Sequence, residues 1–315
     1  MHQWSFNNLS RLPRRCGVGI VVLLMGLWGC TGGPEPHSPE ELRLRQSCHI
    51  DTTAIRAVVD PDTIVGWEGL QTLTAEAWIL VEDSLGLLIS ERQSDVRMFP
   101  ASLTKMMTCI LAIEQVKMTD SIEITPDVCV TRDSRLRSGD GYTAGNLLRE
   151  MMLQSDNVAA VALAKHIGGD TLTFCDMMNR KAAYLGMDST HFANPNGMPN
   201  DSNYTTARDL LVLTRYCMRD SLFAEIVGTS FIDIPLLDGR HLPCQNTNLM
   251  LTDYKGCCGV KTGFTRQAGA CLASQATRNG VTLTLVLLKS KTQASRFTES
   301  AALLDYGFRV VEAYF

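Results

Sequence analysis

The period of the hydrophobic pattern changes along this chain of 315 residues, and that change constrains the fold most strongly. Near the C-terminus, three short segments rich in β-branched and small apolar residues, 259–265, 270–277 and 281–288, predict three strands. The last two are joined through Asn279-Gly280, a pair that favours a type I′ hairpin turn. Near the other end of the folded region, residues 75–91 predict a further hairpin around the tetrapeptide "EDSL".

Between these strands the apolar residues recur at helical spacing. Helical patterns run over 143–167, 172–185 and 206–219, and a final amphipathic helix is expected over 295–306. The first pattern is interrupted by Ser155-Asp156-Asn157, whose capping tendencies suit a bend between two helices. The order predicts an α+β fold, in which one antiparallel sheet is built from both ends of the domain and flanked by helices, with a mostly helical lobe inserted.

The first thirty residues carry the pattern of an export signal. Three arginines precede an apolar run over 17–28 that is too short for a comfortable membrane span. The run ends in Leu27-Trp28-Gly29-Cys30, which resembles a bacterial lipobox, in which the cysteine is lipidated and becomes the first residue of the mature chain. An uncleaved signal anchor is the alternative.

We therefore expect three regions along the chain. Residues 1–29 form a lipoprotein signal peptide, and residues 30–72 hold the lipidated Cys30 and a Gly- and Pro-containing tether with a short helix near 40–47. Residues 73–315 form the folded domain, which is long enough to bury a sizeable core.

Composition excludes several classes of function. The formal net charge is −4, and no cluster of Lys and Arg with interleaved aromatics appears, so we expect no nucleic acid partner. No histidine pair has metal-ligand spacing, so we expect no metal, and nothing calls for another cofactor. Nine of the eleven cysteines remain once Cys16 and Cys30 are set aside, and an odd number excludes a complete disulfide framework.

A lysine interrupts the start of an otherwise apolar helix in "PASLTKMMT", residues 100–108. Ser102 and Lys105 lie three positions apart, so they share a helix face and can touch. Met106, Cys109 and Ile110 form an apolar stripe, which indicates that the helix is buried on that side. An amine near such a stripe is costly unless it is paired or neutral. Alone, S-x-x-K is expected roughly once by chance in such a chain.

Two tripeptides further along make the pattern specific. Ser155-Asp156-Asn157 and Lys261-Thr262-Gly263 follow in that order, and each is expected well under about 0.1 times at average composition. S-x-x-K, S-D-N and K-T-G occur together in penicillin-binding proteins and class A β-lactamases. From about 75 to 308 the chain resembles the serine-type D-Ala-D-Ala carboxypeptidases, or low-molecular-mass penicillin-binding proteins, also in "NTN" at 246–248 and in "GVKTGFTRQAGACL". Many members have Ser-Gly-Asn as the middle triplet, a departure that we expect to be tolerated.

The resemblance implies a serine peptidase that removes the terminal D-alanine from peptidoglycan pentapeptide stems through an acyl-enzyme on Ser102. A serine hydroxyl is a weak nucleophile until a base takes its proton, and Lys105 can do so if its amine is neutral. Burial and the like charge of Lys261 are expected to lower the pKa of Lys105 toward that state. Ser155 is expected to return the proton to the leaving amine.

The remaining site residues are expected to bind substrate. Asn157 would hold the substrate amide, Thr262 would lie on an edge strand that a peptide can join, and Gly263 would allow close backbone approach. By resemblance, the backbone N–H groups of Ser102 and Phe264 form the oxyanion hole. Arg296 matches a family arginine that reaches the substrate carboxylate. Structural roles are expected for Arg208 and His191, which also lie in family-like segments.

Three alternatives stay open from the sequence. A class A-like β-lactamase needs a glutamate in an E-x-x-L-N loop, and the corresponding segment over 189–206 holds none. A catalytically silent lipoprotein that binds peptidoglycan is a second alternative, and endopeptidase action on D-Ala-meso-diaminopimelate crosslinks is a third. The expected partners are stem peptides ending in D-Ala-D-Ala, β-lactams as covalent inhibitors, and a membrane reached through the N-terminal lipid. The expected location is the bacterial cell envelope, facing the periplasm.

Overall fold

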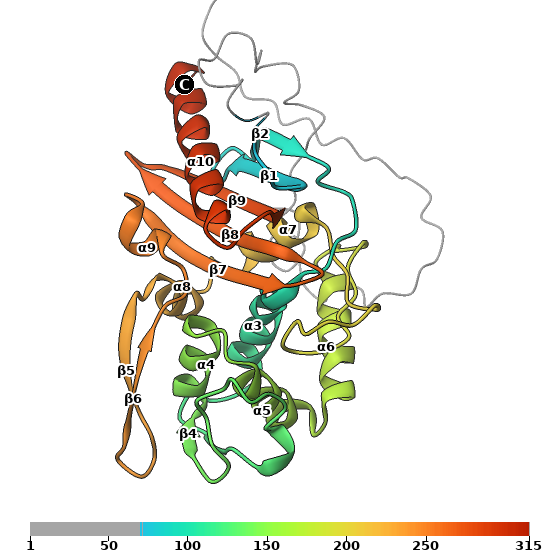
Figure 1. Cartoon of the computed structure of the whole chain (residues 1–315), viewed down its shortest axis with the longest axis vertical. Helices are drawn as coiled ribbons and strands as arrows, with labels where there is room; N and C mark the ends of the chain where they lie inside the picture. The colour runs from blue at the N-terminus through green and yellow to red at the C-terminus, as the bar shows by residue number, and fades with distance from the viewer. Residues whose placement is uncertain (1–69, 71, 315) are drawn as a thin grey trace, which may run out of the picture. The chain divides into compact units, whose positions relative to one another are not determined.

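A five-stranded antiparallel sheet organises the part of the chain that the structure describes, residues 70 and 72–314 of a computed structural model. The strand order is β2-β1-β9-β8-β7, so strands from both ends of the domain pair in one sheet and β7 lies at an edge (Figure 1). The strands are β1 (Ala77–Glu82), β2 (Leu87–Arg92), β7 (Cys257–Thr265), β8 (Gly269–Arg278) and β9 (Val281–Ser290). This arrangement confirms the predicted fold class. The expected signal peptide, Cys30 and the helix near 40–47 lie outside the described residues.

The hairpin between β8 and β9 forms at the predicted turn. Asn279 and Gly280 have φ angles of 52° and 82°, and positive φ at both central residues is what a type I′ turn requires. Successive strand residues face opposite sides of the sheet, so Ile79 and Val81 join one core cluster while Leu80 joins another. The sheet is therefore covered on both faces.

Helix α10 (Ser295–Tyr314) covers one face of the sheet (Figure 1). The predicted helix ends at 306, but the apolar stripe continues through the buried Val310 and Val311, and the helix continues with it. On the other face lies the helical lobe (Figure 1). Its helices are η2 (Ala101–Thr104), α3 (Lys105–Gln115), η3 (Pro126–Val128), α4 (Ala144–Leu153), α5 (Asn157–Gly168), α6 (Thr171–Tyr184), α7 (Ala207–Cys217), α8 (Ser221–Gly228) and α9 (Met250–Asp253).

Side-chain caps fix where the helices of this lobe begin. Thr143, Asp156, Asp170, Thr206 and Asp220 each accept a hydrogen bond from the backbone N–H three residues further on, at the starts of α4 to α8. The predicted bend forms because α4 ends before the S-D-N triplet and α5 begins at its last residue.

Two small two-stranded sheets, the second of them a hairpin, were not predicted. β3 (Ser121–Glu123) pairs with β4 (Gly141–Thr143), and β5 (Phe231–Pro235) pairs with β6 (His241–Gln245). The hairpin carries one buried residue on each strand, Ile234 and Cys244, against an otherwise partly exposed surface. The β5–β6 hairpin therefore buries few side chains against the helical lobe.

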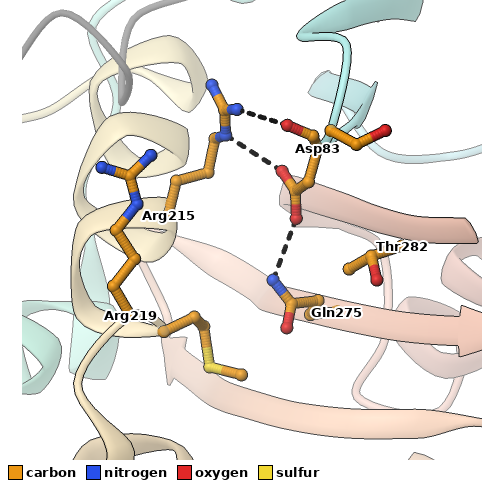
Figure 2. A pocket seen from close by; sticks show the side chains of 7 residues that line it. Asp83, Arg215, Arg219, Gln275 and Thr282 are labelled. Atoms are coloured by element: carbon orange, nitrogen blue, oxygen red, sulfur yellow. Dashed lines mark hydrogen bonds and ion pairs between the residues drawn. The ribbon is translucent and has the colours of Figure 1, made fainter. Parts of the chain in front are cut away.

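A cavity of about 280 Å³ lies between the sheet and the end of α7. In Figure 2, Arg215 approaches Asp83 with two groups, and Gln275 donates to the carboxylate from β8. The Arg215 Nε lies 2.9 Å from the Asp83 carboxylate, and both side chains are mostly buried. Burial raises the pKa of Asp83, against hydrogen bonds from Thr284, Arg215 and Gln275 that lower it. This cluster joins the end of β1 to α7 and is structural.

The state of the cysteines and the apolar character of the helices both bear on the predicted location in the cell envelope. The eight cysteines of the described region are free thiols, and five of them are buried in the apolar core: Cys109, Cys175, Cys217, Cys244 and Cys271. Across residues 70 and 72–314, no helix combines the length and the apolar character that crossing a membrane requires.

Candidate active site

The Ser102 and Lys105 side chains meet where the turn η2 passes into α3. Ser102 lies within the turn, Lys105 is the first residue of the α-helix, and the Lys105 Nζ lies 2.9 Å from the Ser102 Oγ. The amine also lies 2.9 Å from the Asn157 Oδ1 and 2.6 Å from the Asn196 backbone oxygen. Lys105 is completely buried. The contact that the three-residue spacing predicts is therefore present, within a wider set of oxygen atoms.

These contacts suit a neutral amine. The Asn196 carbonyl and the Asn157 amide oxygen only accept hydrogen bonds, so they take the two hydrogens of a neutral NH₂ group. The remaining lone pair then faces the Ser102 hydroxyl, which can donate its proton to it. Burial lowers the pKa of Lys105 from 10.5 to about 7, while the charges of Asp156 and Asp133 act in the opposite direction. A large fraction of the amine is thus neutral near pH 7.

Asp156 holds the S-D-N bend in place. One carboxylate oxygen accepts the Ala159 backbone N–H at 2.9 Å, and the other accepts the Ser134 hydroxyl at 2.6 Å. Ser155, immediately before it, has a φ of 61°, a left-handed conformation that costs free energy in a residue with a side chain and that recurs at active sites. The cap and the Ser134 contact secure this strained turn, which carries Asn157 to the Lys105 amine.

Lys261 and Thr262 enter the site from the edge strand β7. Lys261 is buried and donates to the Thr262 backbone oxygen at 3.0 Å. Burial lowers its pKa well below 10.5, and the charges of Lys105 and Arg296 lower it further. The sequence predicted that the repulsion would act on Lys105. In the structure, burial alone lowers the pKa of Lys105, and the repulsion lowers the pKa of Lys261.

Two glycines allow the backbone segments to meet around the serine. A Cβ atom on Gly263 would lie 3.2 Å from the Ser102 backbone nitrogen, so β7 runs directly along the η2 turn. A Cβ atom on Gly197 would lie 1.8 Å from the Ala101 carbonyl oxygen, which no side chain tolerates. Phe264 follows Gly263 and its side chain is 49% exposed. The two backbones expected to form the oxyanion hole are thus held against each other.

Arg296 reaches the site from behind β7. It is the second residue of α10, is 6% exposed, and its Nη1 donates to the Gly263 backbone oxygen at 3.1 Å. The Nε is buried without a hydrogen-bond partner within the described part of the chain. Burial lowers the pKa of this guanidinium, although an arginine stays protonated at physiological pH. The structure therefore brings Arg296 to the K-T-G strand with a donor to spare.

Thr247 and Asn196 are site residues to which the sequence assigned no role. The Thr247 hydroxyl lies 2.7 Å from the Thr262 hydroxyl, and the Thr247 backbone N–H donates to the Leu153 oxygen at 2.9 Å. The "NTN" segment was visible in the sequence and could have pointed to Thr247. Asn196 acts through its backbone carbonyl, for which residue type gives no signal.

Residues outside the cluster take structural contacts. Arg208 pairs with Glu91 at 2.6 Å and with Asp95 at 2.7 Å, and the His191 ring stacks on Tyr204, as expected for both.

The one glutamate between the second and third motifs, Glu225, pairs with an arginine of α4 at 2.8 Å. The Lys105 amine instead faces a backbone carbonyl at the loop where a β-lactamase would need its glutamate. No group of acidic, histidine and cysteine side chains within residues 70 and 72–314 could hold a metal ion.

Comparison with known families identifies this arrangement. A family model described as D-alanyl-D-alanine carboxypeptidase, peptidase S11, matches residues 65–292. The chain belongs to this family. The match spans all three motifs, so the cluster around Ser102 is the family's motif set in its expected order.

Curated relatives and solved structures agree with this family assignment. The chain is 28% identical over 247 residues to the D-alanyl-D-alanine carboxypeptidase DacF of Bacillus subtilis, covering 76% of this chain and 64% of the relative. It is 31% identical over 256 residues to DacC of Escherichia coli, covering 76% and 63%. The chain thus spans less than two thirds of the length of these relatives. The crystal structure of the Streptomyces K15 DD-transpeptidase is similar with a TM-score of 0.72 at 30% identity, covering 75% of this chain and 98% of that one.

Proposed function

We propose that the protein is a serine D-Ala-D-Ala carboxypeptidase that removes the terminal D-alanine from peptidoglycan pentapeptide stems. One observation carries the proposal: a buried Lys105 amine, with a pKa lowered to about 7, has its hydrogens engaged by two acceptors and its third direction facing the Ser102 hydroxyl. Membership of the D-alanyl-D-alanine carboxypeptidase family supports the choice of substrate. The same nucleophile accounts for acylation by β-lactams.

The first half-reaction forms an ester on Ser102. As the Oγ attacks the carbonyl carbon of the penultimate D-alanine, its proton passes to the Lys105 amine, 2.9 Å away. The negative charge that develops on the carbonyl oxygen is stabilised by the backbone N–H groups of Ser102 and Phe264. The proton returns through the Ser155 hydroxyl to the amine of the terminal D-alanine, which leaves as the C–N bond breaks.

The second half-reaction releases the shortened stem. A water molecule loses a proton to the Lys105 amine and attacks the ester carbonyl, the Ser102 oxygen leaves, and the proton returns to it. Because no glutamate serves this step, we expect slow hydrolysis of the acyl-enzyme formed with penicillin and normal turnover of peptide. This is the reason to prefer a carboxypeptidase over a class A-like β-lactamase.

In this proposal, the substrate's terminal carboxylate is bound by Arg296 and Lys261. Arg296 has a buried Nε without a partner within the described residues, and Lys261 and Thr262 line the same strand. Asn157 holds the substrate amide through its side-chain NH₂, while its oxygen stays on Lys105. Thr247 orients the Thr262 hydroxyl through the 2.7 Å contact between them.

The N-terminal region fits an enzyme at the cell envelope. In this proposal, residues 1–29 are removed, Cys30 is lipidated, and residues 30–72 tether the catalytic domain of residues 73–315 so that it faces the periplasm. Metabolic labelling with a fatty acid tests the anchor. The wild-type chain should be labelled and a Cys30→Ala variant should not; equal labelling would refute lipidation at Cys30.

The decisive experiment combines an adduct with a turnover measurement. Mass spectrometry should find one benzylpenicillin on the wild type and on Ser221→Ala, an exposed serine, but none on Ser102→Ala. Release of D-alanine from diacetyl-Lys-D-Ala-D-Ala should follow the same pattern. Rapid nitrocefin hydrolysis without D-alanine release would indicate a β-lactamase. A wild-type chain without an adduct would indicate a silent binding protein, and cleavage of crosslinked dimers in preference to pentapeptide would indicate an endopeptidase.

A further inference from the structure

A loop over residues 129–140 lies between η3 and β4 and contacts the S-D-N turn of the active site. Three consecutive side chains join the middle of this loop to the helical lobe. The Ser134 hydroxyl donates to the Asp156 carboxylate at 2.6 Å, and the Leu136 side chain is buried in the apolar core. Between them, Arg135 makes polar contacts to which the proposed function assigns no role. We refer to this segment as the 129–140 loop.

Arg135 joins parts of the chain that lie far apart in the sequence. Its Nη2 donates to both carboxylate oxygens of Glu150 in α4, each at 3.0 Å, and its Nη1 donates to the Pro243 backbone oxygen in β6 at 2.6 Å. A guanidinium makes both contacts at once because its N–H groups form a rigid planar fork. Arg135 therefore binds the 129–140 loop to α4 and to the β5–β6 hairpin together.

Glu150 lies at the buried end of this contact. Its side chain is completely buried on α4, and the Cys244 thiol of β6 donates to it at 3.1 Å. Burial raises the pKa of Glu150, while the hydrogen bond from Cys244 and the charge of Arg135 lower it. A buried carboxylate is costly to the fold unless a cation stays beside it. The pairing with Glu150 thus keeps Arg135, and the loop that carries it, in one place.

The β5–β6 hairpin lies beside α4 and supports both the helix and the loop (Figure 1). Gln154, immediately before the S-D-N triplet, donates to the Gln245 backbone oxygen of β6 at 2.5 Å. At the hairpin turn, the Leu237 backbone N–H donates to the Gly141 oxygen at 2.9 Å, directly after the loop ends. The hairpin therefore contacts the helix that leads into the triplet and the loop that packs on it.

The same loop carries a negative charge that acts on the Lys105 amine. The charges of Asp156 and Asp133 both raise the pKa of Lys105 against the effect of burial. Asp133 belongs to the 129–140 loop and is exposed. Among the cations, Lys261 of β7 is repelled by Lys105, and Arg296 of α10 repels Lys261 in turn. A displaced loop would remove one of the two carboxylates that oppose burial.

We propose that Arg135 is a positioning residue of the active site, which fastens the 129–140 loop to α4 and β6. In that position, Ser134 supports the strained turn at Ser155, and the charge of Asp133 acts on the Lys105 amine. This inference rests on the acylation of Ser102 in the proposed function. Release of the loop should slow acylation, because the turn is no longer fixed. It should also lower the pH at which the amine becomes neutral, because a carboxylate moves away.

The second-order rate constant of acylation by benzylpenicillin, measured against pH by stopped flow, tests the proposal. Arg135→Ala alone leaves the buried Glu150 without its cation, so the test uses Arg135→Leu combined with Glu150→Leu, which removes both charges. This double variant should keep a urea midpoint close to that of the wild type. It should lower the plateau of the rate constant about fivefold or more and move the midpoint of the pH profile to lower pH.

Two single variants separate the two effects of the loop. Ser134→Ala, which removes the hydrogen bond to Asp156, should lower the plateau by a similar factor. Asp133→Asn should keep the plateau and move the midpoint to lower pH, and this shift should shrink at about 1 M salt, where exposed charges are screened. Arg149→Ala is the matched control, because it breaks an ion pair between α4 and α8, at 2.8 Å, and should keep both plateau and midpoint.

The outcomes separate this inference from the proposed function. A folded double variant with the plateau and midpoint of the wild type would overturn the positioning role of Arg135. Wild-type profiles in both Ser134→Ala and Asp133→Asn would overturn it as well, whether or not the double variant folds. A wild type that is acylated by benzylpenicillin but releases no D-alanine from diacetyl-Lys-D-Ala-D-Ala would instead overturn the carboxypeptidase. A wild type that forms no adduct would overturn both.

Discussion

Replacing the buried Lys105 by methionine should stabilise the fold while it abolishes acylation. The folded state holds this lysine completely buried with a pKa of about 7, whereas an unfolded lysine has a pKa of 10.5. Between these values the unfolded chain binds more protons than the folded chain. Protonation of Lys105 therefore favours the unfolded state below pH 10.5. The free energy of unfolding rises with pH between pH 7 and pH 10.5.

The magnitude follows from the two pKa values. At pH 7 the difference in protonation favours the unfolded state by on the order of 4 kcal/mol. Methionine is similar in length and carries no charge, but it leaves the buried Asn196 carbonyl without its donor, at a cost of about 1–3 kcal/mol. The Lys105→Met variant should thus be more stable by about 2 kcal/mol at pH 7, or about 5 °C in Tm for a domain of this size. Relief of the repulsion on Lys261 acts in the same direction.

Urea unfolding followed by circular dichroism at several pH values tests this reasoning. The advantage of Lys105→Met should shrink as the pH rises, and the order should reverse near pH 9, where the protonation difference has fallen to about the 2 kcal/mol cost of the unpaired carbonyl. Lys117→Met, at an exposed lysine, provides the control and should show a small difference that does not depend on pH. A Lys105→Met variant that is less stable than the wild type at pH 7, or whose difference is constant with pH, would refute a largely neutral buried amine.

Three further predictions concern the same fold. Because the neutral form of Lys105 is the base, the second-order rate of acylation by penicillin should rise about tenfold from pH 6 to pH 8, and a flat profile in stopped-flow measurements would contradict this role. Asp83→Ala, which leaves the mostly buried Arg215 without its carboxylate, should lower the free energy of unfolding by about 3 kcal/mol with an unchanged penicillin adduct; an unchanged urea midpoint would count against the ion pair. Gly197→Ala should lose adduct formation, because its Cβ would lie 1.8 Å from the Ala101 oxygen, and full labelling would show that the loop can move away.

The sheet was predictable because its strands carry local signals. The Asn279-Gly280 turn, the β-branched runs and the change of period each point to the same pairing, and nothing in the tertiary structure overrides them. The β5–β6 hairpin was missed, although Asp238-Gly239 between its strands is a recognised hairpin signal. Its strands carry too few apolar residues to stand out beside the helical pattern.

The candidate site was predictable only where side chains carry the chemistry. The first two motifs contain three side chains that meet, because the Lys105 Nζ lies 2.9 Å from both the Ser102 Oγ and the Asn157 Oδ1. The Asn196 carbonyl contributes a backbone atom, which any residue could supply. The left-handed conformation of Ser155 is imposed by the Asp156 cap and its contact with Ser134, a residue far back in the chain. Such features follow from tertiary packing and not from local residue type.

The burial that makes Lys105 costly to the folded state also makes its amine a base. Burial alone would lower the pKa of Lys105 further. An amine with too low a pKa is a poor base at neutral pH. The charge of Asp156 raises the pKa of Lys105 against the effect of burial, and hydrogen bonds from Ser134 and Ala159 fix the position of its carboxylate. The same residue caps α5 and so positions Asn157 on the amine. One side chain therefore contributes both to the geometry of the base and to its pKa.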